Sequence, residues 1–397
     1  MTPNRFPRET ITVWAPLLPV IAANLCIIIF IAIIYPFPSM FDELGHVSVV
    51  RAQFEHPDLF ADTRNYMLVR AEDIARWSGN ANYINHPALY YLGIAPLLGF
   101  DHQVLALRFA NVAMSMLAFA ILLTTGVRFF GAVADRVMFA IIVASFPKTA
   151  LTGGMVNNDN LAMVAAALVF SGMSGSALSG LMVAGGLALA GWTKLTALIA
   201  LATAVGVKAL LDYKCGLFRR DNWLALGGLV IGSLPYLVSF ARTGKLFHVN
   251  VAVFGTPPQS RPDWDFFDYT REFFVWFVAK WPAAEASLPL AIGTLLMLLP
   301  LFLAAIGIVK DHRVRSIGIA YFAATFVTLA LHFTFGWQSF KSIGDLSISQ
   351  TRYYNVLWPG LALAGAAAIS QLRILRYPAL LFYIVPTVIG GAIIALL

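Results

Sequence analysis

Two adjacent carboxylates follow directly on the first apolar run of the chain. The run covers roughly residues 15–36, and Asp42 and Glu43 come next in P-F-P-S-M-F-D-E-L-G-H. Aromatic or Lys/Arg side chains normally flank a helix that leaves a bilayer, so an acid pair is unusual there. Partial removal from water raises the pKa of a carboxylate, and such a group can accept a proton from a hydroxyl. We therefore predict that Asp42 and Glu43 are catalytic; the alternative is a solvated acid pair in a loop.

Two histidines and a tyrosine occur close to this acid pair or in the segment that ends the same loop. His46 follows Glu43 by three residues, which is one step along a helix. His86 and Tyr90 lie in N-Y-I-N-H-P-A-L-Y-Y. A residue before proline is pushed out of the helical region, so a helix is expected to begin after His86. We expect His46, His86 and Tyr90 to bind substrate; the alternative for the second motif is a helix start with an aromatic belt.

A run of four polar residues interrupts the apolar segments near residue 157. The motif G-G-M-V-N-N-D-N ends in Asn157, Asn158, Asp159 and Asn160. Capping of a helix N-terminus accounts for one of these residues, but not for four. Polar clusters at membrane depth usually face the bundle interior or a water-filled cavity. Asn158 and Asp159 are therefore predicted to bind substrate.

Two cations lie within or beside later apolar segments. Lys194 occurs in A-G-W-T-K-L-T, and Arg352 occurs in S-Q-T-R-Y-Y-N-V-L-W-P. A lysine in a membrane segment is costly unless it is paired, and arginine presents a fork of donors that suits phosphate. Snorkelling of Lys194 to an interface and interfacial anchoring by Arg352 are the alternatives. Weaker candidates of the same kind are Arg108, Lys148 and Lys341.

The sequence predicts that membrane helices carry these residues. The 397 residues are 59% hydrophobic and 12% charged, whereas soluble domains carry about 25% charged residues. A helix needs about 20 apolar residues to cross the hydrocarbon. We predict an all-α polytopic membrane protein, a bundle of about eleven transmembrane helices at roughly 15–36, 105–127, 136–151, 159–175, 178–193, 195–212, 222–240, 286–309, 316–333, 353–371 and 377–396.

The distribution of charge predicts the orientation. With a cytoplasmic N-terminus, the short inner loops carry an excess of Lys/Arg, which agrees with the positive-inside rule. The net charge of +7 is thus an orientation signal that needs no nucleic-acid partner. The two long segments 37–104 and 241–285 then lie outside, and both are amphipathic enough to form interfacial helices. Because long loops tend to carry function, we expect a periplasmic active site on an inner-membrane protein.

Acids on early loops and cations near later helix ends suit the transfer of a sugar from a polyprenyl-phosphate donor. The leaving group is a lipid phosphate, whose developing charge needs cations. The acceptor hydroxyl needs a carboxylate base on the opposite side of the anomeric carbon, because in-line displacement inverts that centre, as in inverting glycoside chemistry. The donor arrives through the bilayer, which accounts for an enzyme embedded in the membrane.

The order of these motifs along nearly the whole chain resembles the GT-C superfamily of membrane glycosyltransferases. Within that superfamily, the motifs resemble those of the protein O-mannosyltransferases, the aminoarabinose transferase of lipid A and bacterial homologues of unassigned acceptor. The resemblance implies that Asp42 is the catalytic base, Glu43 its neighbouring acid and Asp159 a second acid. It also implies that His86 is the His or Gln of the loop's closing motif. Lys194 and Arg352 match positions near the carrier phosphate. The motifs are F-D-E-L-G-H, N-H-P-A-L-Y-Y, L-R-F-A-N, V-N-N-D-N-L-A, G-L-A-L-A-G-W-T-K-L-T and Q-T-R-Y-Y-N-V-L-W-P.

The chain departs from these relatives in two respects. Many have two prolines where this chain has Pro87-Ala88, and many carry a large soluble C-terminal domain. We expect one membrane domain over residues 1–397 without such a domain, so acceptor recognition falls to the outer loops or a partner protein. The partners expected are a polyprenyl-phosphate sugar, membrane lipids and a glycan, lipid or protein acceptor.

We expect no cofactor. Relatives that use oligosaccharide carriers bind a divalent metal at a richer set of acids, and the mannosyltransferase-like members generally do not. A metal site could form here, but ligands at these scattered spacings are not a metal motif. The residues concerned are Asp42, Glu43, His46, His86 and Asp159.

Three other classes of protein compete with this interpretation. A transporter or flippase predicts internal repeats and a site at the bilayer midplane. A polysaccharide polymerase or ligase favours arginines and histidines in an external loop over an acid base. A structural membrane subunit leaves the acids and Lys194 without a role.

Overall fold

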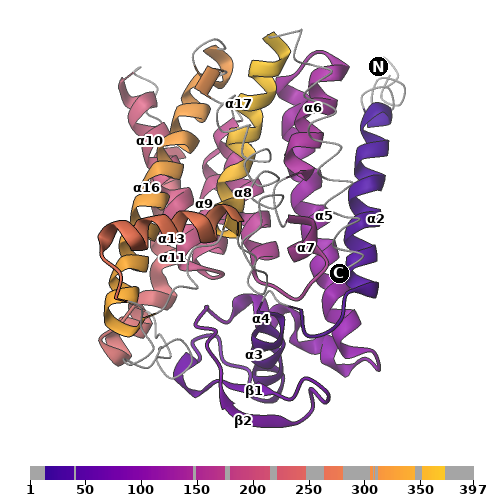
Figure 1. The fold of residues 1–397 in the computed structure, drawn as a ribbon. Coiled ribbons are helices and arrows are strands. Elements are labelled where there is room, and N and C mark those ends of the chain that lie inside the picture. The colour runs from indigo at the N-terminus through magenta and orange to yellow at the C-terminus, as the bar shows by residue number, and fades with distance from the viewer. Residues whose placement is uncertain are drawn as a thin grey trace.

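The computed structural model consists of a helical bundle with a smaller unit at one end (Figure 1). The structure describes residues 14–39, 42–145, 149–174, 179–214, 221–246, 263–279, 305–306, 308, 312–344 and 351–371.

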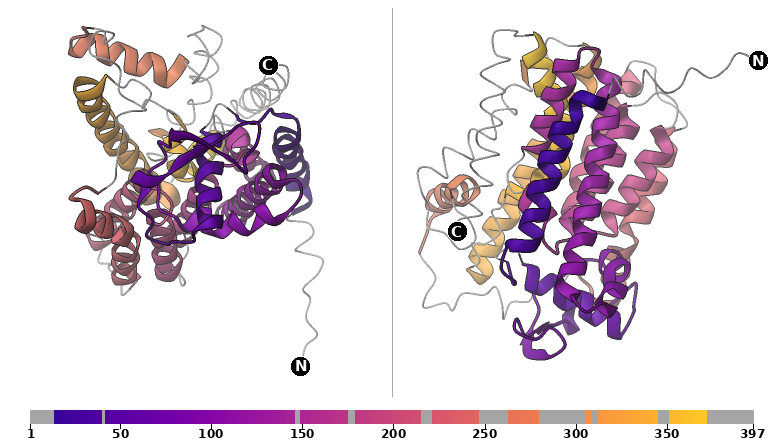
Figure 2. Two further views of the ribbon diagram at one scale, coloured as in Figure 1. Left: turned by 90° about the horizontal axis from the view of Figure 1, so that it is seen from below. Right: turned by 90° about the vertical axis from the view of Figure 1, so that its right-hand side faces the viewer.

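The bundle contains helices that run along its length, side by side (Figures 1 and 2). Five described segments are long and apolar enough to cross a membrane: Ala15–Ile34, Gln103–Phe129, Leu195–Tyr213, Asn222–Thr243 and Val314–Ser342. The prediction of a polytopic all-α membrane protein is thereby confirmed. The elements are η1 (Ala15–Leu17), α2 (Leu18–Ile34), α5 (Gln103–Phe129), α6 (Val133–Ala144), α7 (Thr149–Gly153), α8 (Asp159–Ser174), α9 (Ser179–Gly191), α10 (Leu195–Lys214), α11 (Asp221–Thr243), α16 (His312–Ile343), η5 (Thr351–Leu357) and α17 (Trp358–Gln371).

Most predicted spans coincide with a described helix, with two kinds of exception. The predicted span 136–151 corresponds to two helices: α6 ends at Ala144, and α7 begins at Thr149. The predicted span 377–396 lies outside the described residues, as does nearly all of 286–309.

Small residues bring α9 and α11 into close contact. A Cβ atom added to Gly191 would lie 2.0 Å from the carbonyl oxygen of Gly232, and one added to Gly228 would lie 2.3 Å from that of Ala184. Membrane helices associate through such close backbone packing, because the lipid removes the hydrophobic drive between them. The contact holds α11 against α9, the helix that leads to Lys194.

The smaller unit is formed by the first predicted outer segment. Its elements are α3 (Glu43–Glu55), η2 (Thr63–Asn65), β1 (Met67–Val69), β2 (Trp77–Ala81), α4 (Leu89–Ile94) and η3 (Ala95–Gly99). Helices were predicted here, but the antiparallel sheet, which pairs Met67 with Ala81 and Val69 with Trp77, was not. Val47, Val49 and Val50 of α3 are fully buried in a core shared with Tyr90 and Tyr91. This helix is therefore part of a packed unit beneath the bundle (Figure 1).

Helix α13 (Phe266–Ala279) lies in the second predicted outer segment. Its buried Tyr269 and Phe273 pack with Phe340 of α16, while Phe266 and Phe267 are exposed. Figure 1 shows α13 running across the bundle rather than along it. An aromatic helix in this direction fits the predicted interfacial position.

Candidate functional site

Four charged side chains from distant parts of the sequence meet where the smaller unit adjoins the bundle. The Nη2 atom of Arg352 donates a hydrogen bond to Asp42 Oδ2, and the Nε atom of Arg352 lies 3.9 Å from Asp159 Oδ2. Lys194 Nζ donates to Asp159 Oδ1 over 2.6 Å. Carboxylates and cations thus alternate along one chain of contacts, which we call the charge chain: Asp42, Arg352, Asp159 and Lys194. Each was predicted as a site residue, and the structure brings them together.

The backbone at Asp42 has an uncommon conformation. Asp42 precedes α3 with φ 61°, and it is the one non-glycine residue with positive φ among the described residues. Aspartate tolerates the left-handed region better than most residues, and residues held in such conformations cluster at functional sites. Its Oδ1 accepts a hydrogen bond from the Tyr83 hydroxyl at 3.1 Å. The main chain and this bond together fix the direction of the carboxylate.

Gly45 allows the Tyr83 segment to approach α3. A Cβ atom at Gly45 would lie 2.9 Å from Ile84 Cγ1 and 3.1 Å from Asn82 Oδ1. The Asn82 side-chain amide donates to the Gly45 carbonyl at 2.9 Å. The glycine of D-E-L-G-H therefore has a steric role, and a larger residue would displace the segment that carries Tyr83.

Tyr353 contributes an aromatic ring that both cations of the charge chain approach. Lys194 Nζ lies 4.5 Å from the ring centroid and Arg352 Cζ lies 5.6 Å from it, within the range of cation–π attraction. The ring of His332 packs edge-on against Tyr353 at 5.4 Å. Neither Tyr353 nor His332 was predicted. Tyr353 could have been predicted from its position directly after Arg352. Nothing in the sequence marked His332.

Glu43 is enclosed by four hydrogen-bond donors. Arg108 donates from Nε and Nη2 to its two oxygens at 2.8 and 2.7 Å. The backbone amides of Ser39 and Val156 donate to the same carboxylate at 3.0 and 3.1 Å. Its side chain has no exposed surface, although the sequence predicted a catalytic acid. Glu43 thus ties α3 to α5 and to the segment before α8.

Arg108 is likewise committed to the protein. Besides Glu43, its guanidinium donates to the backbone carbonyls of Ala32 and Tyr35 at 3.1 and 2.7 Å. This residue was a weaker candidate for holding phosphate. Of the others, Lys148 lies outside the described residues, and Lys341 contacts the Trp337 ring at 5.5 Å.

The two predicted histidines lie together beside the charge chain. Their rings stack at 6.1 Å with an interplanar angle of 16°. His46 Nδ1 lies 2.9 Å from the hydroxyl oxygen of Tyr91. The side chain of His46 is buried, whereas that of His86 is partly exposed. His86 is therefore the one of the pair with surface available to a substrate.

Tyr90 and Asn158, also predicted to bind substrate, are fully buried. The Tyr90 hydroxyl donates to Asn111 Oδ1 at 2.8 Å, and Asn160 Nδ2 donates to the same oxygen. Tyr90 thus joins a buried network between α4, α5 and α8. Asn158 Nδ2 donates to the Thr193 carbonyl at 3.0 Å, next to Lys194, while its Oδ1 has no hydrogen-bond partner among the described residues.

The pKa of Asp42 differs in direction from the sequence prediction. Burial raises the pKa of this carboxyl. The charge and hydrogen bond of Arg352, with smaller contributions from His46 and Tyr83, together outweigh burial, so the pKa lies below its usual value. The prediction of a raised pKa was wrong because the partner, 310 residues away in sequence, could not be seen. A carboxylate in this state is ionised at neutral pH and able to accept a proton.

Burial lowers the pKa of His46 to about 3 and that of His86 well below its usual value. The unfolded chain then binds more protons than the folded one between about pH 3 and pH 6.5, the ordinary pKa of histidine. Each such group lowers the unfolding free energy by about 1.4 kcal/mol per pH unit as the pH falls through this window. Both imidazoles are neutral at pH 7.

We expect the thermal unfolding midpoint in detergent to fall between pH 7 and pH 5, and to fall less in His46→Gln. The substitution removes one group that must remain uncharged in the folded state. His56→Gln is the matched control, since His56 is in the same unit but exposed, and it should keep the wild-type slope. The same slope in His46→Gln as in wild type would contradict the assignment. The measurement is a fluorescence-monitored melt at each pH.

No group of three or more His, Cys, Asp or Glu side chains among the described residues is placed to hold a metal ion. The absence of a cofactor remains a prediction from the sequence.

Comparisons with known proteins find similarity among solved structures. No family model matches the chain, and no curated protein matches it. The fold is similar to the crystal structure of ArnT from Cupriavidus metallidurans in the apo state. The TM-score is 0.44, with 15% sequence identity over 88% of this chain and 76% of that chain. It is also similar to ArnT bound to undecaprenyl phosphate, with a TM-score of 0.44 and 12% identity over 90% and 78% of the two chains.

Proposed function

We propose that this protein is an inverting glycosyltransferase that moves a sugar from a polyprenyl-phosphate donor to a hydroxyl acceptor. The charge chain is the observation that carries the proposal. It combines an ionised carboxylate able to accept a proton with two cations able to hold a phosphate, at one end of a membrane bundle. The reaction needs both parts, on opposite sides of the anomeric carbon.

Asp42 is the proposed base because it is the accessible member of the charge chain. Its side chain is 29% exposed, whereas those of Arg352, Asp159 and Lys194 are 4%, 6% and 8% exposed. An acceptor hydroxyl can therefore reach Asp42. The oxygen of that hydroxyl attacks the anomeric carbon while its proton passes to Asp42, and the bond from that carbon to the phosphate oxygen breaks.

Lys194 and Arg352 are the proposed ligands of the carrier phosphate. Asp159 contacts both cations and so sets the distance between them. An incoming phosphate competes with Asp42 for Arg352. Loss of the Arg352 contact removes the main influence that lowers the pKa of Asp42, so donor binding makes Asp42 a stronger base. The base is thus activated only when the donor is present.

The remaining predicted residues receive supporting roles in this proposal. Glu43 positions Asp42 by fixing the start of α3. Tyr90 supports the buried hydrogen-bond network that includes Asn111 and Asn160. His86 lines the acceptor side of the site, the buried His46 supports it by stacking against its ring, and Asn158 holds the turn before Lys194. The protein is proposed to sit in the inner membrane with a cytoplasmic N-terminus, which places the charge chain on the periplasmic side.

The test is release of undecaprenyl phosphate from a panel of undecaprenyl-phosphate sugars by the purified protein, in liposomes that contain a total membrane lipid extract as the source of acceptor hydroxyls. We expect release with one class of sugar, and its dependence on Asp42 would identify the donor. Transport of the intact donor across the bilayer, without release, would favour a flippase and overturn the proposal. Release accompanied by growth of a sugar polymer would favour a polymerase instead.

A further inference from the structure

Helix α11 has a proline in its interior, and a side chain from outside the helix bonds to the carbonyl that this proline leaves open. Proline has no N–H, so Pro235 cannot donate to the carbonyl of Ile231, four residues earlier in the helix. The indole Nε1 of Trp192 donates to this carbonyl at 2.9 Å. Trp192 therefore supplies the hydrogen bond that the helix cannot make at this point.

The close packing of α9 on α11 brings the two partners together. Gly191 directly precedes Trp192, and Gly232 directly follows Ile231. A Cβ atom at Gly191 would lie 2.0 Å from the carbonyl oxygen of Gly232, so a larger residue at position 191 would push the helices apart. The approach of the two backbones thus places the indole beside the carbonyl of Ile231.

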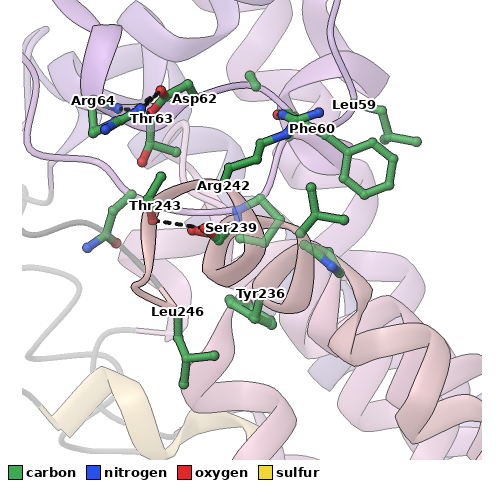
Figure 3. Close-up of a pocket in the computed structure, with 16 residues that line it drawn as sticks. Leu59, Phe60, Asp62, Thr63, Arg64, Tyr236, Ser239, Arg242, Thr243 and Leu246 are labelled. Carbon is green, nitrogen blue, oxygen red and sulfur yellow. Dashed lines mark hydrogen bonds and ion pairs between the residues drawn. The ribbon is translucent and has the colours of Figure 1, made fainter.

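Trp192 also contacts the smaller unit. Its ring packs edge-on against that of Phe60, with the centroids 5.2 Å apart. Arg242, near the end of α11, donates to the carbonyl of Phe60 at 2.7 Å, and Figure 3 shows its side chain extending from α11 toward Phe60. The contacts therefore form a closed cycle, from Trp192 to Ile231, along α11 to Arg242, and back through Phe60. Trp192 cannot move far without breaking one of them.

Trp192 begins the short turn between α9 and α10 that carries Lys194. The backbone N–H of Lys194 donates to the carbonyl of Ala190 at 2.8 Å, and Asn158 Nδ2 donates to the carbonyl of Thr193 at 3.0 Å. Asn158 thus holds the turn from the side of α8, and Trp192 holds it from the side of α11. Lysine carries a point charge on a flexible stem, so the place of its backbone decides where the ammonium group can act.

We infer that Trp192 is a positioning residue for binding of the carrier phosphate. Its hydrogen bond to Ile231 holds the turn so that Lys194 reaches both Asp159 and an incoming phosphate. The inference rests on the proposed function, in which Lys194 is a ligand of that phosphate. Trp192→Phe tests it, because phenylalanine keeps an aromatic ring against Phe60 but has no N–H to donate.

Native mass spectrometry of the whole protein in detergent measures the affinity for undecaprenyl phosphate. We expect Trp192→Phe to bind this lipid about fivefold more weakly, the scale of one neutral hydrogen bond. Trp223→Phe is the matched control, since Trp223 lies on α11 but is 65% exposed, and it should bind as wild type does. Lys194→Gln should bind about tenfold more weakly. Adding Trp192→Phe to Lys194→Gln should cause no further loss, because Trp192 acts through Lys194.

Pro235→Ala separates positioning from stability. Alanine supplies the N–H that the carbonyl of Ile231 lacks, so Trp192→Phe should lower the thermal unfolding midpoint in the native background but not in the Pro235→Ala background. The loss of affinity for undecaprenyl phosphate should remain in both backgrounds, because a backbone donor within α11 cannot hold the turn that carries Lys194. If affinity recovers together with stability, Trp192 has only a structural role and the inference is wrong.

Two other results would overturn the inference. Wild-type affinity in Trp192→Phe would mean that Lys194 is placed without this hydrogen bond. A fivefold loss that persists in the Lys194→Gln background would mean that Trp192 affects binding by another route. Unchanged binding by Lys194→Gln itself would instead refute the phosphate role of Lys194 in the proposed function, and this inference with it. Asp42-dependent release of undecaprenyl phosphate is measured separately, so the two failures are distinguishable.

Discussion

Asp42→Asn is expected to lower the rate of sugar transfer by about 10²–10⁴, the usual contribution of general acid–base catalysis. Asparagine has the same size as aspartate and also tolerates a positive φ, which Asp42 has at 61°. The variant should therefore fold, while its amide cannot accept the proton of the acceptor hydroxyl. The measurement is the initial rate of undecaprenyl phosphate release, with the amount of folded protein determined by size-exclusion chromatography.

Two matched variants define what this loss means. Tyr83→Phe removes the hydrogen bond to Asp42 but keeps the carboxylate, so a loss of about tenfold or less is expected for one neutral hydrogen bond. Glu55→Gln removes an exposed carboxylate of α3 from the same unit, outside the charge chain, and should not change the catalytic rate constant. If Asp42→Asn retains transfer within tenfold of wild type, Asp42 is not the base.

The types of the site residues were predictable from the sequence, but their pairing was not. Asp42, Asp159, Lys194 and Arg352 stood out because ionisable groups near apolar segments are costly. That cost is offset by partners, and the partners come from segments up to 310 residues apart. Without the fold, Arg352, the proposed phosphate ligand, could not be recognised as the group that lowers the pKa of Asp42.

In the fold, the long helices were predictable from the sequence, whereas the short elements were not. Helices such as α5 and α11 were predicted because each contains an apolar run about as long as a helix needs to cross a bilayer. The sheet of β1 and β2 was missed, since strands of three and five residues are too short to show a clear alternation. The break between α6 and α7 was missed because both helices are apolar, and hydropathy does not distinguish one helix from two in succession.

The roles of Glu43 and Asp42 differ because only one of the two acids is already saturated with donors. Glu43→Gln is expected to lower the unfolding free energy by about 3–5 kcal/mol, since it leaves the buried charge of Arg108 without its partner. The hydrogen-bond distances of 2.7 and 2.8 Å and the absence of exposed surface on Glu43 make this a buried ion pair, in which the loss of one partner is strongly destabilising. Denaturant titration in detergent micelles measures the loss.

The double variant Glu43→Gln/Arg108→Gln separates a positioning role from a catalytic one. It removes both charges, and we expect it to be more stable than Glu43→Gln alone by about 0.5–3 kcal/mol, the range of coupling between residues in contact. If Glu43 acts only by holding α3 in place, transfer activity should rise together with stability. If the double variant regains stability but transfers no sugar, Glu43 itself takes part in the reaction. The carboxylate of Asp42 would then need its neighbour for chemistry as well as for position.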